Sequence, residues 1–141
     1  MLAYQWLEQA SARWTRLDML LALLDETIRV LETLAQPEPQ EPGREPSPDQ
    51  ERQWQRAELL LAVLISGVNP TLGEVAVACL RTYEYVYHIV RHRKTNQLPS
   101  AVNVLATIRS GFEAIRSEAN ELERQGVIPS LAASSSWGVV A

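Results

Sequence analysis

Apolar residues recur every three or four positions through the first 35 residues of the chain, which is the spacing of one helix face. No proline or glycine interrupts residues 2–35, so the pattern permits one continuous helix. A break near Trp14, which would leave a short extra N-terminal helix, is the alternative. The a/d-type positions of the repeat are Leu7, Ala10, Trp14, Leu17, Leu21, Leu24, Ile28, Leu31 and Ala35, and they are flanked by Met19, Leu20, Leu23, Val30 and Leu34. Because this stripe is wider than a simple seam, the helix is expected to contact neighbours on more than one side.

Proline and polar residues replace the helical pattern over residues 36–48, which predicts an extended loop with little to bury. A second helix is expected to begin at Ser47 as its cap, with Pro48 in the first helical position and Gln50 completing a capping box. Gly67 is predicted to end this helix in a left-handed conformation. Its apolar positions are Trp54, Leu61, Leu64 and Ile65.

A third helix is predicted from about Thr71 to Lys94. Asn69 would act as its cap before Pro70, and Thr71 stands three positions before Glu74, as in a capping box. Its apolar stripe consists of Leu72, Val75, Cys79, Thr82, Val86, Ile89 and Val90. Three tyrosines spread over other faces, so at least one is expected at a boundary of the core, where partner surfaces are usually built; they are Tyr83, Tyr85 and Tyr87.

A fourth helix is expected to follow the short connection at residues 95–99 and to end near Gln125, with Gly126 as its stop. Its apolar face consists of Val104 or Leu105, Ile108, Phe112, Ile115, Ala119 and Leu122. The pattern therefore predicts an all-α fold, an antiparallel up-down four-helix bundle. We expect residues 1–128 to form this single domain and residues 129–141, which include Trp137, to form a flexible tail.

Composition narrows the classes of function. The chain has 141 residues, enough for one domain with a real core, and its net charge of −4 gives no reason to expect nucleic acid. The single cysteine, Cys79, cannot form an internal disulfide and is predicted to act as a small buried apolar residue. The N-terminus does not have the pattern of a secretory signal, and no apolar run is long enough for a membrane span. These features predict a soluble, cytoplasmic protein.

Candidate catalytic chemistry is sparse. His88 and His92 lie four residues apart on one helix face, with Glu84 one turn earlier, and imidazole and carboxylate groups suit zinc or iron. The helical drift makes three such ligands converge poorly, so a surface pair of Glu84 and His88 is the favoured interpretation over a metal site. Gly73 and Gly111 are isolated and do not form a phosphate-binding loop. The sequence thus predicts neither an enzyme nor a cofactor.

Four short pieces of the chain occur in a characteristic order. They are Ala3-Tyr4-Gln5, Leu17 with Leu20-Leu21, Gly73-Glu74-Val75-Ala76, and Tyr83-Glu84-Tyr85-Val86, and Pro99 precedes the last helix. In these pieces and their spacing the chain resembles the flagellin-specific export chaperones, the FliS family, over nearly its whole length. The corresponding family pieces are Ala-Tyr-Gln, Leu-x-x-Met-Leu-Tyr, Gly-Glu-Ile-Ala, Tyr-Asp-Tyr-Met and Asp-Pro.

The resemblance implies a cytoplasmic helical bundle that binds newly made flagellin and keeps its C-terminal segment from polymerising before export. The client segment would lie in apolar grooves, as in helix-in-groove recognition. The chain departs from the family where Trp14-Thr15 replaces a Ser-Pro or Thr-Pro break, where Ala22 replaces a tyrosine, and where Arg93-Lys94 replaces Ala-Asn. With the long loop at residues 36–48, these departures indicate a divergent member whose client need not be an ordinary flagellin.

Candidate partner-binding residues follow from the apolar faces and from the resemblance together. They are Tyr4, Leu7, Met19, Leu20, Leu24, Leu61, Leu64, Val75, Cys79, Thr82, Tyr83, Tyr85 and Val86. Bundle core is the alternative for several of them, notably Leu24 and Tyr83, whereas Met19 and Leu20 lie beside the core stripe and fit a groove better. The alternative function from another class is a self-associating bundle whose apolar faces form a homodimer core.

Overall fold

A computed structural model describes residues 15–36 and 47–126 of the chain. These residues form four α-helices, with no strand among them. The helices are α2 (Arg16–Ala35), α3 (Pro48–Ser66), α4 (Glu74–Arg91) and α5 (Leu98–Arg124). Two short 3₁₀ turns, η1 (Pro70–Leu72) and η2 (Thr95–Gln97), flank α4. The predicted all-α fold class is confirmed.

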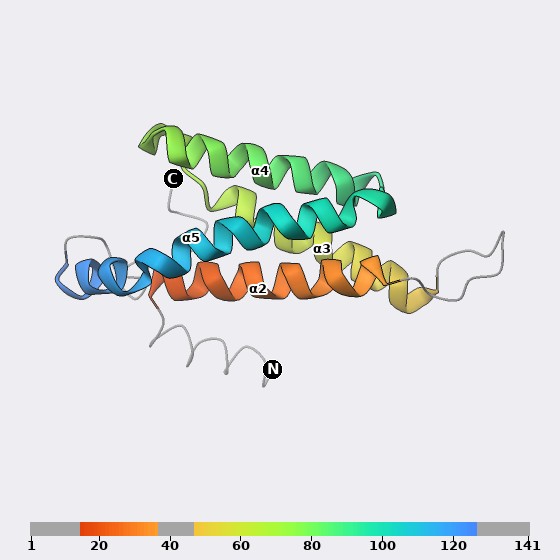
Figure 1. Ribbon diagram of the computed structural model, residues 1–141, viewed down its shortest axis with the longest axis horizontal. Helices are drawn as coiled ribbons and strands as arrows, with labels where there is room; N and C mark the ends of the chain where they lie inside the picture. The colour runs from red at the N-terminus through yellow and green to blue at the C-terminus, as the bar shows by residue number, and fades with distance from the viewer. Residues whose placement is uncertain (1–14, 37–46, 127–141) are drawn as a thin grey trace.

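Successive helices run in opposite directions and lie next to one another (Figure 1). Helix α2 packs against α3 and α5, and α4 packs against the same two helices from the other side. This closed cycle of neighbours is the up-down bundle that the short connections favour. Figure 1 also shows that α4 and α5 converge at the η2 connection and diverge toward the start of α4.

The core is concentrated at the end of the bundle where α4 and α5 converge. On α4 every buried residue lies at Tyr83 or later, and on α5 the buried apolar residues end at Leu105. The other core residues come from α2 and α3, and they include Leu24, Val30, Leu31, Leu34, Trp54, Ala57, Leu61 and Leu64. The bundle is therefore closely packed at one end. At the other end, the first half of α4 diverges from α5 and has no buried residue.

Helix α2 begins with a capping box that the apolar pattern of the sequence does not reveal. The Thr15 hydroxyl accepts a hydrogen bond from the Asp18 amide, and the Asp18 carboxylate accepts one from the Thr15 amide. Thr15 is extended, with φ −78° and ψ 169°, so a continuous helix through this position is excluded. Tyr4 and Leu7, two of the candidate binding residues, lie outside the described residues, as do the predicted tail and most of the proline-rich loop.

The start of α4 also differs from the prediction. The Asn69 side chain accepts hydrogen bonds from the Thr71 amide and hydroxyl, so it caps η1 rather than α4. Helix α4 begins at Glu74, without a side-chain cap, after Gly73 with φ 129° and ψ −171°. The predicted box between Thr71 and Glu74 is therefore wrong, and α4 is shorter than expected at both ends. At the start of α3, Ser47 caps as predicted, and its hydroxyl accepts a hydrogen bond from the Gln50 amide. At the end of α3, Gly67 is right-handed at φ −81°, so the predicted left-handed conformation is wrong.

The backbone of Gly73 gives a testable prediction. Its φ and ψ lie in a region that essentially only glycine occupies, and an added Cβ would meet no atom within 4 Å. Gly73→Ala should therefore lower the free energy of unfolding by about 1–3 kcal/mol through backbone strain alone. Urea denaturation measures this loss. Gly111→Ala, in the exposed interior of α5 with equally open space, is the matched control and should raise stability by about 0.5–1 kcal/mol.

Candidate partner-binding pocket

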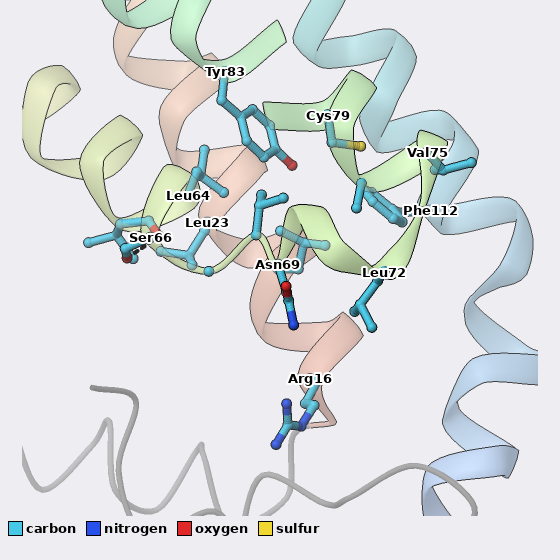
Figure 2. Close-up of a pocket in the computed structure, with 15 residues that line it drawn as sticks. Arg16, Leu23, Leu64, Ser66, Asn69, Leu72, Val75, Cys79, Tyr83 and Phe112 are labelled. Carbon is cyan, nitrogen blue, oxygen red and sulfur yellow. Dashed lines mark hydrogen bonds between the residues drawn. The ribbon is translucent and has the colours of Figure 1, made fainter. Parts of the chain in front are cut away.

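A pocket of about 470 Å³ lies at the open end of the bundle. It is bounded by the first turns of α2, the end of α3, the connection through η1, the first half of α4 and Phe112 of α5 (Figure 2). The described lining residues are mostly apolar, and those used below are Leu20, Leu23, Leu64, Leu72, Val75, Cys79, Tyr83 and Phe112. The volume is within the range of ordinary ligand sites in proteins.

The pocket is open because the chain turns sharply before α4. The 3₁₀ turn η1 and the glycine-only conformation of Gly73 set the direction in which α4 begins. Leu72 and Val75, at 78% and 76% exposed, consequently stand at the mouth instead of entering the core. Exposed aliphatic residues that border an apolar cavity extend its apolar surface outward, which is a feature of interaction sites.

The polar groups of the lining are few and mostly engaged within the chain. The Ser66 hydroxyl donates to the Val63 carbonyl at 2.8 Å, and the Asn69 side chain accepts a hydrogen bond from the Thr71 amide in η1. Burial raises the pKa of the Cys79 thiol and of the Tyr83 hydroxyl, so both groups are protonated at neutral pH. The described lining contains no carboxylate and no imidazole. The pocket thus offers a ligand apolar surface with a few hydrogen-bonding groups.

The structure divides the predicted binding residues into three sets. Leu20, Leu64, Val75, Cys79 and Tyr83 line the pocket together. A second set, fully buried in the core, consists of Leu24, Leu61 and Val86. A third set lies outside the pocket lining and consists of Met19, Thr82 and Tyr85, the last with its hydroxyl 3.5 Å from the Ser100 hydroxyl.

Several lining residues were not among the predicted binding residues. Leu72 and Phe112 were recognised as apolar positions but assigned to helix faces, and Leu23 was assigned to the flank of the first stripe. The segment Gly67–Asn69 carries no periodic signal, because it is a connection rather than a helix. Arg16, at the mouth, could have been found only through the Thr15–Asp18 capping box, which fixes where α2 begins.

A polar cluster at the start of α2 holds one wall of the pocket in place. The Thr15 hydroxyl donates to Asn120 Oδ1, Arg116 pairs with Asp18 at 2.8 Å, and the Arg16 amide donates to the buried Glu123 carboxylate at 3.3 Å. A carboxylate at a helix N-terminus is favoured by the helix dipole. A smaller cavity of about 210 Å³ lies beside the cluster, and Leu20 lines both cavities. The cluster therefore fixes the end of α2 that carries the pocket wall.

The carboxylate of Asp18 should make stability depend on pH. Burial alone would raise its pKa, but hydrogen bonds from Thr15, Asn120 and Arg116 outweigh burial and hold the pKa below its ordinary value. The stabilisation is therefore present above the unfolded-state pKa of about 3.9 and is lost as the pH falls through the folded-state pKa. Asp18→Asn should lower the free energy of unfolding by about 1–2 kcal/mol at neutral pH.

Urea denaturation of both proteins at neutral pH and near pH ~3 measures this effect, and the difference between them should shrink in acid. Glu118→Gln, on an exposed part of α5, is the control and should change little at either pH. A difference between Asp18→Asn and the native protein that stays constant across this range would contradict the assignment.

The two histidines lie near the end of α4 and are not among the described lining residues of the pocket. Their ring centroids are 4.3 Å apart at an interplanar angle of 55°, and within the described residues His88 makes no ion pair with Glu84. Desolvation, His92 and Lys94 together lower the pKa of His88. No group of three metal-ligating side chains occurs in the part of the chain that the structure describes.

Within residues 15–36 and 47–126, no helix is both long and apolar enough to cross a bilayer. Comparison with protein-family models, with curated protein sequences and with solved structures yields no match to this chain.

Proposed function

We propose that this chain is a client-binding helical bundle, an export chaperone that receives an apolar segment of flagellin or of a flagellin-like protein in the pocket at its open end. The observation that carries the proposal is the pocket itself, an apolar cavity whose mouth is formed by the exposed Leu72 and Val75. An export chaperone must hold an aggregation-prone segment reversibly. A preformed apolar pocket on a helical bundle can hold such a segment reversibly, without a covalent or catalytic step.

Helix-in-groove recognition fits the geometry. The walls come from three helices, with Leu20 on α2, Leu64 on α3 and Cys79 on α4, and Phe112 of α5 closes the remaining side. An amphipathic client segment could insert one or two anchor side chains, each contributing about 1.5–3 kcal/mol when fully buried. Further contacts at the exposed mouth residues would add to this affinity.

The identity of the client rests on the resemblance to flagellin-specific chaperones. The piece Gly73-Glu74-Val75-Ala76 that carries the resemblance is the piece that turns the chain into α4 and forms the pocket mouth. The next piece begins with Tyr83, which lines the pocket floor about two turns further along α4. On the strength of this resemblance we propose that the protein acts in the cytoplasm, where it would keep the flagellin C-terminal segment from polymerising before export.

Isothermal titration calorimetry of the full chain with a C-terminal flagellin fragment tests this proposal. We expect saturable binding with one fragment per chain and a negative heat-capacity change, because apolar surface is buried. A fragment of identical composition and scrambled order should give no heat. Absence of heat with the native fragment would contradict the flagellin assignment.

Self-association is the second candidate function, and the same exposed residues favour it. A second copy of the chain could cover Leu72 and Val75 as a client would. Sedimentation of the chain alone separates the two functions. A stable dimer that Leu72→Glu converts to monomer, together with no heat from the flagellin fragment, would replace the chaperone proposal with this one.

A further inference from the structure

Tyr83 has an unusual place in the pocket. Its side chain is only 1% exposed, and its ring packs within the core cluster of the bundle. Figure 2 shows the hydroxyl directed into the cavity, on the side of Cys79. Within the described residues, no side chain or backbone group forms a hydrogen bond with this hydroxyl.

A hydroxyl in this position makes the pocket sensitive to the chemistry of what fills it. A cavity of about 470 Å³ can hold water that satisfies the hydroxyl while the pocket is free. A ligand that enters displaces this water, so a purely apolar ligand would leave the buried hydroxyl without a partner. Leaving a buried donor unpaired is costly, whereas supplying an acceptor recovers the hydrogen bond.

The charge of the lining restricts the ligand further. The described lining residues include no carboxylate, and Tyr83 and Cys79 on the floor are both protonated at neutral pH. An ionised group bound at the floor would therefore lose its hydration without an opposite charge beside it. A neutral group is complementary to this part of the pocket, and an ammonium group is not.

We propose that the pocket selects a client side chain with a neutral hydrogen-bond acceptor at the end of an apolar stem, a carboxamide or hydroxyl group, and that Tyr83 donates to it. This inference rests on the proposed function in one respect only, that the occupant belongs to a client protein. Tyr83 is then the specificity-determining residue at the floor, and the aliphatic walls bind the stem. The pocket would distinguish asparagine or glutamine anchors from leucine anchors of nearly the same shape.

The single cysteine of the chain allows a test without any client. Cys79 lies one helical turn from Tyr83 and lines the same pocket.

Symmetric disulfides of three small thiols are equilibrated with the protein. They are mercaptopropanamide, its hydrocarbon isostere isopentyl thiol, and cysteamine, which carries an ammonium group. In each exchange Cys79 forms one sulfur–sulfur bond with a fragment and the other half of the reagent leaves as a thiol. Intact-protein mass spectrometry then gives the fraction labelled by each.

We expect the amide fragment to be favoured over the isopentyl fragment by about fivefold or more, relative to the same ratio in urea-unfolded protein. Tyr83→Phe should remove this excess, and cysteamine should label the folded protein least. If the protein of unchanged sequence gave the same ratio of amide to isopentyl labelling when folded and when unfolded in urea, the inference would be overturned. That comparison needs no variant. The labelling experiment contains no flagellin, so its result is independent of the calorimetry. If labelling were as expected and flagellin did not bind, the selectivity of the pocket would be supported and only flagellin as the client would be rejected.

Discussion

Replacing Val75 with glutamate should weaken client binding by about 100-fold or more. Val75 stands at the mouth of the pocket and is 76% exposed in the free protein, so the substitution changes little in the fold itself. In the complex the client would cover this position and remove the new carboxylate from water. Burying an unpaired charge costs several kcal/mol, and each 1.4 kcal/mol is about a factor of ten in affinity. Calorimetry with the flagellin fragment measures the loss.

Leu59→Glu is the matched control for this substitution. Leu59 is also a large exposed aliphatic residue, at 66%, but it lies on α3 away from the described pocket lining. It should bind the fragment with the affinity of the native protein. If both substitutions weakened binding equally, the client would be bound through general surface hydrophobicity and the pocket would lose its role.

Leu61→Ala should cost about 2–5 kcal/mol of unfolding free energy, because Leu61 is fully buried in the core. The folded fraction should nevertheless bind the client with unchanged affinity, since Leu61 does not line the pocket. Leu20→Ala should behave in the opposite way. Leu20 is half-buried and lines the pocket, so its loss should reduce affinity more than stability.

Urea denaturation and calorimetry on the two variants measure both quantities. This pair tests the division between core and binding residues that the apolar pattern alone left open. Reduced affinity in Leu61→Ala at full folding, with native affinity in Leu20→Ala, would reverse the division.

The helices were predictable because their apolar residues repeat with the helical period over long stretches. The Ser47 cap and the end of α5 near Gln125 were found within a residue or so, since each has a clear local signal. The start of α2 was missed because Trp14 continues the apolar repeat across Thr15, which hides the capping box. The start of α4 was missed because Asn69 and Thr71 can cap either a 3₁₀ turn or an α-helix.

The binding site was only partly predictable, for a reason that concerns α4. Val75 and Val86 belong to one apolar stripe, yet Val75 is exposed and Val86 is buried. Nothing local distinguishes them, because the difference arises where α4 diverges from the other helices after Gly73. Likewise, Leu20 and Leu24 lie one turn apart on α2, and only the position of the opposing helices decides which one lines a pocket.

Protection of Cys79 is the measurement that tests the central claim most directly. Because Cys79 is the only cysteine of the chain and lines the pocket, its rate of alkylation by a maleimide reports on that pocket alone. With flagellin fragment at ten times its dissociation constant, we predict alkylation to slow by about tenfold, in proportion to occupancy. An unchanged rate while calorimetry shows the fragment bound would place the client elsewhere on the bundle and contradict the account.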